Sequence, residues 1–124
     1  MDDAGGTIYQ LQPSAGNWTF NVLYSFNLGP NQPEDTPTLD ASGNLYGTTS
    51  GGSGGTGSIF KLTRGSNGWN YTNLYDFTDV SMGYQPVGGV ALDQSGNLYG
   101  TTFYGGNFPQ GYDLGCGVVW ELVP

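Results

Sequence analysis

The sequence predicts an all-β protein built from copies of one unit, and internal repetition carries this prediction. Residues 39–49 return as residues 92–102 with ten of eleven positions identical, at an offset of 53. A second element appears three times, at residues 6–11, 57–62 and 117–122. A repeat period near 50 residues lies in the range of β-propeller blades, which are four-stranded antiparallel sheets. We therefore expect about two and a half four-stranded antiparallel repeats.

The threefold element has the pattern of a β-strand, because wholly apolar and mixed positions alternate with a period of two. One face is expected to carry Tyr9, Leu11, Phe60, Leu62, Trp120 and Leu122. The other face is expected to carry Ile8, Gln10, Ile59, Lys61, Val119 and Glu121. No window has a convincing helical period, and Gly or Pro interrupts every candidate helix.

A third repeated segment begins with tryptophan and also alternates. In residues 18–26 the pattern predicts that every second side chain points one way, namely Trp18, Phe20, Val22, Tyr24 and Phe26. The next copy repeats this arrangement with Trp69, Tyr71, Tyr75 and Phe77, and Asn73 is its one polar interruption.

The order of these segments predicts how the single domain, residues 1–124, is organised. With the strands of one blade lettered a to d from the inside outward, the chain reads c-d, then a-b-c-d, then a-b-c. This gives a partial blade at 6–26, a full blade at 36–77 and a partial blade at 87–122. Both partial blades contain a c strand, so one c strand is in excess.

The Asp-x-Ser-Gly-Asn segments at 40–44 and 93–97 are interpreted as tight turns between two short strands. Gly43 and Gly96 supply the positive φ such a turn needs, and Asp and Ser side chains bond local backbone N–H groups. A Ca²⁺ loop is the alternative, but it requires several alternating carboxylates and each segment has one. We expect no metal site.

The charge of the chain disfavours anionic partners. Ten acidic residues face two basic ones, Lys61 and Arg64, for a net charge of −8. We therefore expect neither nucleic-acid binding nor adhesion to an anionic membrane. Cys116 is the single cysteine and is interpreted as a small apolar filler. There is no apolar run of transmembrane length and no secretion signal at residues 1–5.

The sequence does not favour catalysis, and we expect no cofactor. The chain has no histidine, which removes the usual general base and the commonest zinc ligand. A glycosidase needs two carboxylates on opposite sides of a sugar, and the spacing of the acidic residues suggests no such pair. The candidate carboxylates are Glu34, Asp35, Asp76, Asp79, Asp113 and Glu121.

The repeated motifs resemble those of a known family. Gly-Asn-Leu-Tyr-Gly-Thr-Thr, a Gly-rich stretch, Gly-x-Ile-Phe-Lys-Leu and Trp-x-x-x-x-Leu-Tyr-x-Phe are similar to GloVer-type tandem repeats. The pattern is more distantly similar to NHL-type propeller blades. The resemblance implies a β-propeller without transferable catalytic residues. It also implies an extracellular or cell-surface location for the parent protein.

Two and a half blades cannot close a ring, so their aromatic faces and strand edges require neighbours. We expect a homo-oligomer in which the carboxy-terminal blade of one subunit is completed by the amino-terminal strands of the next. A ring is favoured over a fibre, because blades related by rotation tend to close. The abrupt ends also favour a segment cut, naturally or deliberately, from a longer array.

Three functions remain open at this point. The leading hypothesis is a non-catalytic structural or binding module that self-assembles. The first alternative is a glycan- or protein-binding surface formed by the aromatic residues Phe103, Tyr104, Phe108 and Tyr112. The opposing interpretation is that these rings pack on a neighbouring blade. The second alternative is a propeller enzyme whose site forms only between subunits.

Overall fold

The computed structural model describes residues 5–27, 32–51, 55–107 and 114–124. Its named strands all pair antiparallel, and the described residues contain no α-helix, only the short 3₁₀ turn η1 (Val80–Met82). The predicted all-β class is confirmed. The strands are β1 (Thr7–Ser14), β2 (Asn17–Ser25), β3 (Thr38–Leu39), β4 (Leu45–Thr49), β5 (Ser58–Gly65), β6 (Gly68–Asp76), β7 (Tyr84–Pro86), β8 (Ala91–Leu92), β9 (Leu98–Tyr104) and β10 (Val119–Leu122).

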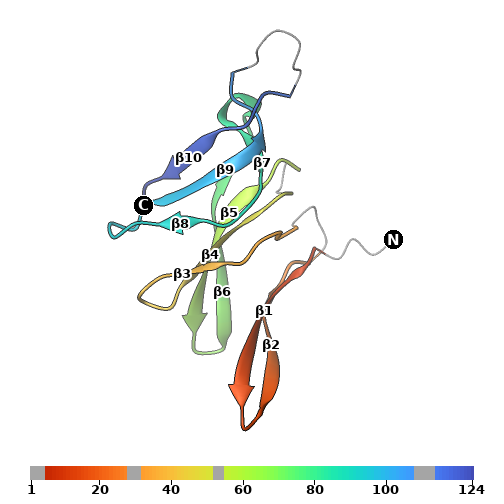
Figure 1. Cartoon of the computed structure of the whole chain (residues 1–124), viewed down its shortest axis with the longest axis vertical. Coiled ribbons are helices and arrows are strands. Elements are labelled where there is room, and N and C mark those ends of the chain that lie inside the picture. Colours follow the sequence, from red (N-terminus) through yellow and green to blue (C-terminus); the bar gives the residue numbers. More distant parts are fainter. Residues whose placement is uncertain (1–4, 28–31, 52–54, 108–113) are drawn as a thin grey trace.

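The strands form three units that follow one another along the long axis of the molecule (Figure 1). Unit 1 is the hairpin β1-β2, and unit 2 is a four-stranded meander in the order β3-β4-β5-β6. In unit 3, β9 pairs with β10 along one edge. Its other edge pairs with β8 near its start and with β7 near its end.

The two long hairpins contain the same β-bulge, which corrects one prediction. In unit 1, Ile8 pairs with Tyr24 but Tyr9 pairs with Val22, so Leu23 is an extra residue. In unit 2 the register shifts at the equivalent place, and Leu74 is extra. A bulge of one residue reverses the alternation beyond it. The alternating aromatic residues of each segment therefore do not all point one way.

The buried side chains form two clusters, one at each junction between units. The cluster between units 1 and 2 is built around Ile8, Phe26, Phe60 and Leu62. The cluster between units 2 and 3 is built around Ile59, Phe77, Val90 and Leu98. After the bulge, Phe26 points to the first cluster and Phe77 to the second. Unit 2 is thus covered on both faces by its neighbours.

The same residue positions are buried in unit 2 and exposed in unit 1. Tyr9 and Leu11 are 58% and 52% exposed, whereas their counterparts Phe60 and Leu62 are 1% and 0% exposed. We call this open side of unit 1 the head face; it carries Tyr9, Leu11, Trp18, Phe20 and Val22, all exposed. Burial at these positions therefore depends on whether another unit lies against them.

Unit 3 is exposed on the other side of its sheet, the side that carries Val119. Val119 is 81% exposed, although its counterparts Ile8 and Ile59 are buried against the unit that follows each of them. We call this side the tail face, and we use head face and tail face for the equivalent sides of all three units. Each junction inside the chain thus joins the tail face of one unit to the head face of the next.

Candidate functional site

The two Asp-x-Ser-Gly-Asn segments form the predicted turns. The Asp40 Oδ1 atom accepts hydrogen bonds from the backbone N–H of Ser42 (2.9 Å) and of Asn44 (2.8 Å). Its Oδ2 atom accepts from Asn44 Nδ2 (2.8 Å) and from the Tyr46 hydroxyl (3.2 Å). Gly43 has a φ of 83°, which only glycine adopts without strain. The Asp40 carboxylate is thus occupied by the turn itself.

The second turn repeats this network and adds one contact. Asp93 accepts from Ser95, Asn97 and the Tyr99 hydroxyl in the same way. Desolvation raises the pKa of both aspartates, but these hydrogen bonds outweigh it and hold each pKa below its ordinary value. The one proton of the Tyr99 hydroxyl is shared between Asp93 at 3.1 Å and Glu121 at 2.8 Å, and the bond to Glu121 chiefly raises the pKa of Tyr99.

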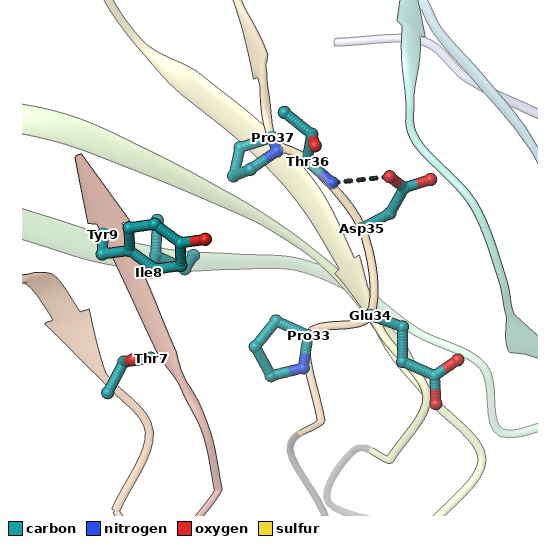
Figure 2. A pocket seen from close by; sticks show the side chains of 8 residues that line it. All are labelled: Thr7, Ile8, Tyr9, Pro33, Glu34, Asp35, Thr36 and Pro37. Atoms are coloured by element: carbon teal, nitrogen blue, oxygen red, sulfur yellow. Dashed lines mark hydrogen bonds between the residues drawn. The ribbon is translucent and has the colours of Figure 1, made fainter. Parts of the chain in front are cut away.

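A cleft of about 400 Å³ lies along the free edge of β1, between this strand and the segment 33–37 that leads to β3. We call it the edge cleft. Thr7, Ile8 and Tyr9 line one side (Figure 2). The carboxylates of Glu34 and Asp35 point away from β1 and from each other, and Asp35 accepts a hydrogen bond from Thr36 N (Figure 2). The edge cleft therefore offers backbone and apolar surface but no facing carboxylate pair.

A second cleft, of about 340 Å³, contains two of the predicted binding residues. We call it the aromatic cleft; Phe103 and Tyr104 at the end of β9 line it together with polar groups of the neighbouring unit. Phe103 is 59% exposed and lies 4.7 Å from Tyr104, ring centre to ring centre. Phe108 and Tyr112, the other two predicted residues, lie outside the described residues.

The polar part of the aromatic cleft was not predicted from the sequence. Gln32, Glu34 and Gln85 line it, and the ring of Tyr84 stacks on Tyr104 at 5.2 Å. A signal was present, because the Pro33 and Pro86 segments are related by the same offset of 53 as the turns. The two prolines pair with equivalent residues of β4 and β9, Pro33 with Thr49 and Pro86 with Thr102.

The two basic side chains of the protein lie over aromatic rings. Lys61 lies 5.3 Å from the ring centre of Tyr46, and Arg64 lies 5.9 Å from that of Trp69. In the described ranges, no three His, Cys, Asp or Glu side chains are grouped so that they could hold a metal ion. No helix in this part of the chain has the length and apolar character to cross a bilayer.

Residues 1–121 match the model of the Gloeobacter/Verrucomicrobia repeat family. The chain belongs to this family. This confirms the resemblance to GloVer-type repeats that the sequence motifs indicated. None of the curated proteins or solved structures searched matches the chain.

The match to the Gloeobacter/Verrucomicrobia repeat covers β1 to β9 and all of β10 except its last residue, Leu122. The two clefts, the head face and the tail face are therefore all built by repeat residues. Differences between the units reflect which neighbours each unit has, since the repeated positions carry similar residues.

Proposed function

We propose that this chain is a non-catalytic repeat module that assembles with copies of itself, its units acting as blades of a β-propeller. Its partner is a second copy of the same chain, and closure into a ring is favoured over a fibre because rotated blades tend to close. The resemblance to GloVer-type repeats favours an extracellular or cell-surface setting.

The observation that carries this proposal is the contrast between equivalent positions in the units. The head face of unit 1 is exposed, whereas the same face of unit 2 is covered by Ile8, Phe26 and their neighbours. A contiguous exposed apolar patch of this kind is rare on a soluble monomer and marks an interaction site. The chain itself contains the surface that covers such a face.

The arrangement of polar groups supports a role without catalysis. Asp40 and Asp93 are used by their turns, and Glu34 and Asp35 do not face each other across the edge cleft (Figure 2). Acid–base hydrolysis requires two groups positioned on either side of a substrate.

Replacing Leu11 by lysine tests the proposal. Leu11→Lys places a charge in the middle of the head face and removes a buried leucine from the assembled state. We expect association to weaken by about 10- to 100-fold, because burying a leucine contributes about 1.5–3 kcal/mol and each 1.4 kcal/mol is a factor of ten. The measurement is mass by light scattering across a dilution series.

Gln12→Lys is the matched control. Gln12 is one residue away on the same strand and belongs to the opposite, exposed side of the hairpin. We expect its assembled mass to equal that of the unmodified chain. A single species of 13.1 kDa at all concentrations for the unmodified chain would rule out self-assembly.

Carbohydrate binding at the aromatic cleft is a second candidate, favoured by the exposed ring of Phe103 beside the amides of Gln32 and Gln85. Aromatic faces pack on sugar rings, and amides hydrogen-bond their hydroxyl groups. We expect glycan-array signal from the assembled protein to fall about tenfold in Phe103→Ala and to persist in Leu39→Ala, which alters an exposed apolar side chain outside both this cleft and the head face. A blank array with the unmodified assembly would reject this candidate.

A further inference from the structure

The free edge of β1 lacks the strand that its counterpart in unit 2 possesses. β5 pairs with β6 on one edge and with β4 on the other. Within the described residues β1 pairs with β2 alone, and the edge cleft lies along its other edge. A free strand edge presents unpaired N–H and C=O groups to any strand that can reach it.

The surroundings of the edge cleft match those of β4. Segment 33–37, which forms its far wall, corresponds to 86–90 by the offset of 53. Segment 86–90 contacts β4 of unit 2, because Thr48 Oγ1 donates a hydrogen bond to the carbonyl of Gly88 at 3.2 Å. The occupant that fits is therefore a strand with the sequence of β4, and β9 has this sequence at 98–102.

We infer that, in the assembled state, β1 of one copy takes the place of β10 on strand β9 of a second copy. The inference rests on the proposed self-assembly and names the strands that perform it. The edge cleft is then a β-augmentation site whose ligand is β9 of another copy.

The repeat fixes the register of this pairing. By equivalence with β4 and β5, Leu98 pairs with Leu11, Gly100 with Tyr9 and Thr102 with Thr7. The space beside an aromatic ring explains why β4 and β9 both have glycine at this position. A Cβ on Gly47 would lie 2.5 Å from the Phe60 ring, and one on Gly100 would lie 2.2 Å from the Trp120 ring. In both present pairs an aromatic ring lies across the glycine, and Tyr9 supplies the ring in the exchanged pair.

Three features indicate that β10, and not β1, gives way. β10 is four residues long, whereas β1 has eight and brings β2 with it as a formed hairpin. Trp120 Nε1 is the one buried side-chain polar atom of the described residues without a hydrogen-bond partner, which costs free energy. Val119 buries little of its side chain against the rest of the molecule.

The exchange also buries the head face of unit 1 in a type of interface that the chain already contains. β1 arrives on β9 in the register that β10 now has, where Trp120 and Leu122 pair with Gly100 and Leu98. Tyr9 and Leu11 therefore take the place of Trp120 and Leu122, which pack on the cluster around Ile59 and Phe77. Unit 3 also gains β2, which pairs with β1 on the side away from β9. The junction between units 2 and 3 is thereby continued between copies.

Disulfide trapping tests the exchange in the full chain. The variant carries Gln10→Cys and Tyr99→Cys in a Cys116→Ser background. These positions become cross-strand neighbours, at a Cα separation of about 4.5–5.5 Å that suits a disulfide. Under mild oxidation we expect most of the protein to migrate as covalent multimers of the 13.1 kDa chain on a non-reducing gel.

The control carries Tyr99→Cys and Glu121→Cys in the same background, a pair that is adjacent when β10 stays in place. We expect little closure within one chain in the assembled sample. We also expect Val119→Lys to leave the assembled mass unchanged, because β10 is outside the assembled sheet.

The outcomes separate the exchange from self-assembly. An oligomeric mass with intrachain closure of the control pair and no covalent multimers would overturn the exchange and leave self-assembly standing. A loss of mass in Val119→Lys would also count against the exchange. A monomeric mass for the unmodified chain would overturn both.

Discussion

Replacing Leu62 by alanine is expected to lower the free energy of unfolding by about 2–5 kcal/mol, at any protein concentration. Leu62 is fully buried between units 1 and 2, beside Phe60, Phe26 and Ile8. The substitution leaves a cavity that this close-packed cluster cannot fill. Because a small domain is stabilised by about 5–15 kcal/mol in total, this is a large fraction of its stability.

The matched substitution, Leu11→Ala, changes the same repeat position in unit 1. Leu11 is half exposed in a single copy, so its replacement is expected to change the stability of the dilute chain by no more than about 0.5 kcal/mol. At high concentration the loss appears, because Leu11 is then buried between copies and assembly stabilises the folded state by mass action. Urea unfolding at two protein concentrations distinguishes the two variants. Equal losses at both concentrations for Leu11→Ala would show that the head face is not covered by another copy.

This pair of leucines shows how far the sequence could predict the structure. The strands of the repeated segments and the two Asp-x-Ser-Gly-Asn turns were predictable, because each is encoded by local residues that occur twice or three times, whereas β7 was not predicted. The difference between Leu11 and Leu62 was not, since both have the same local pattern and only the neighbouring unit decides burial. A repeat sequence specifies the shape of a unit more directly than its surroundings.

The bulges and clefts were missed for related physical reasons. A prediction from period-two alternation assumes that successive residues always point to opposite faces, so it cannot detect the extra residue at Leu23 or Leu74. The repeated Leu-Tyr pair at both places was the available sign. The aromatic cleft joins Phe103 and Gln85 of unit 3 to Gln32 before unit 2, and no local pattern brings such distant segments together.

Gly57→Ala is the second substitution with a large expected effect. Gly57 has a φ of 104°, and a Cβ there would lie 2.2 Å from Pro86 Cδ and 2.7 Å from the carbonyl oxygen of Thr49. The strained backbone costs about 1–3 kcal/mol, and the clash adds to it because it involves a backbone atom and a rigid ring. We expect the free energy of unfolding, measured by urea denaturation, to fall by at least about 3 kcal/mol.

Gly43→Ala separates the two causes. Gly43 also has a positive φ, of 83°, but an added Cβ would meet no atom within 4 Å. It is therefore expected to cost only the backbone term, about 1–2 kcal/mol. An equal loss in both variants would show that the close approach at Gly57 is unimportant.

The larger loss at Gly57 should also be localised. The Gly57 carbonyl accepts a hydrogen bond from Phe77 N at 2.9 Å, and Thr56 next to it accepts from Gln85 N at 2.6 Å. The first bond extends the pairing of β5 with β6, and the second ties the segment before β5 to β7 of unit 3. Displacing Pro86 therefore loosens the junction between units 2 and 3 before the rest of unit 2, and faster amide exchange at Phe77 and Gln85 than at Leu62 would report it.

Because the inferred exchange places β1 of another copy at this same junction, Gly57→Ala is also expected to weaken assembly, whereas Gly43→Ala leaves it intact.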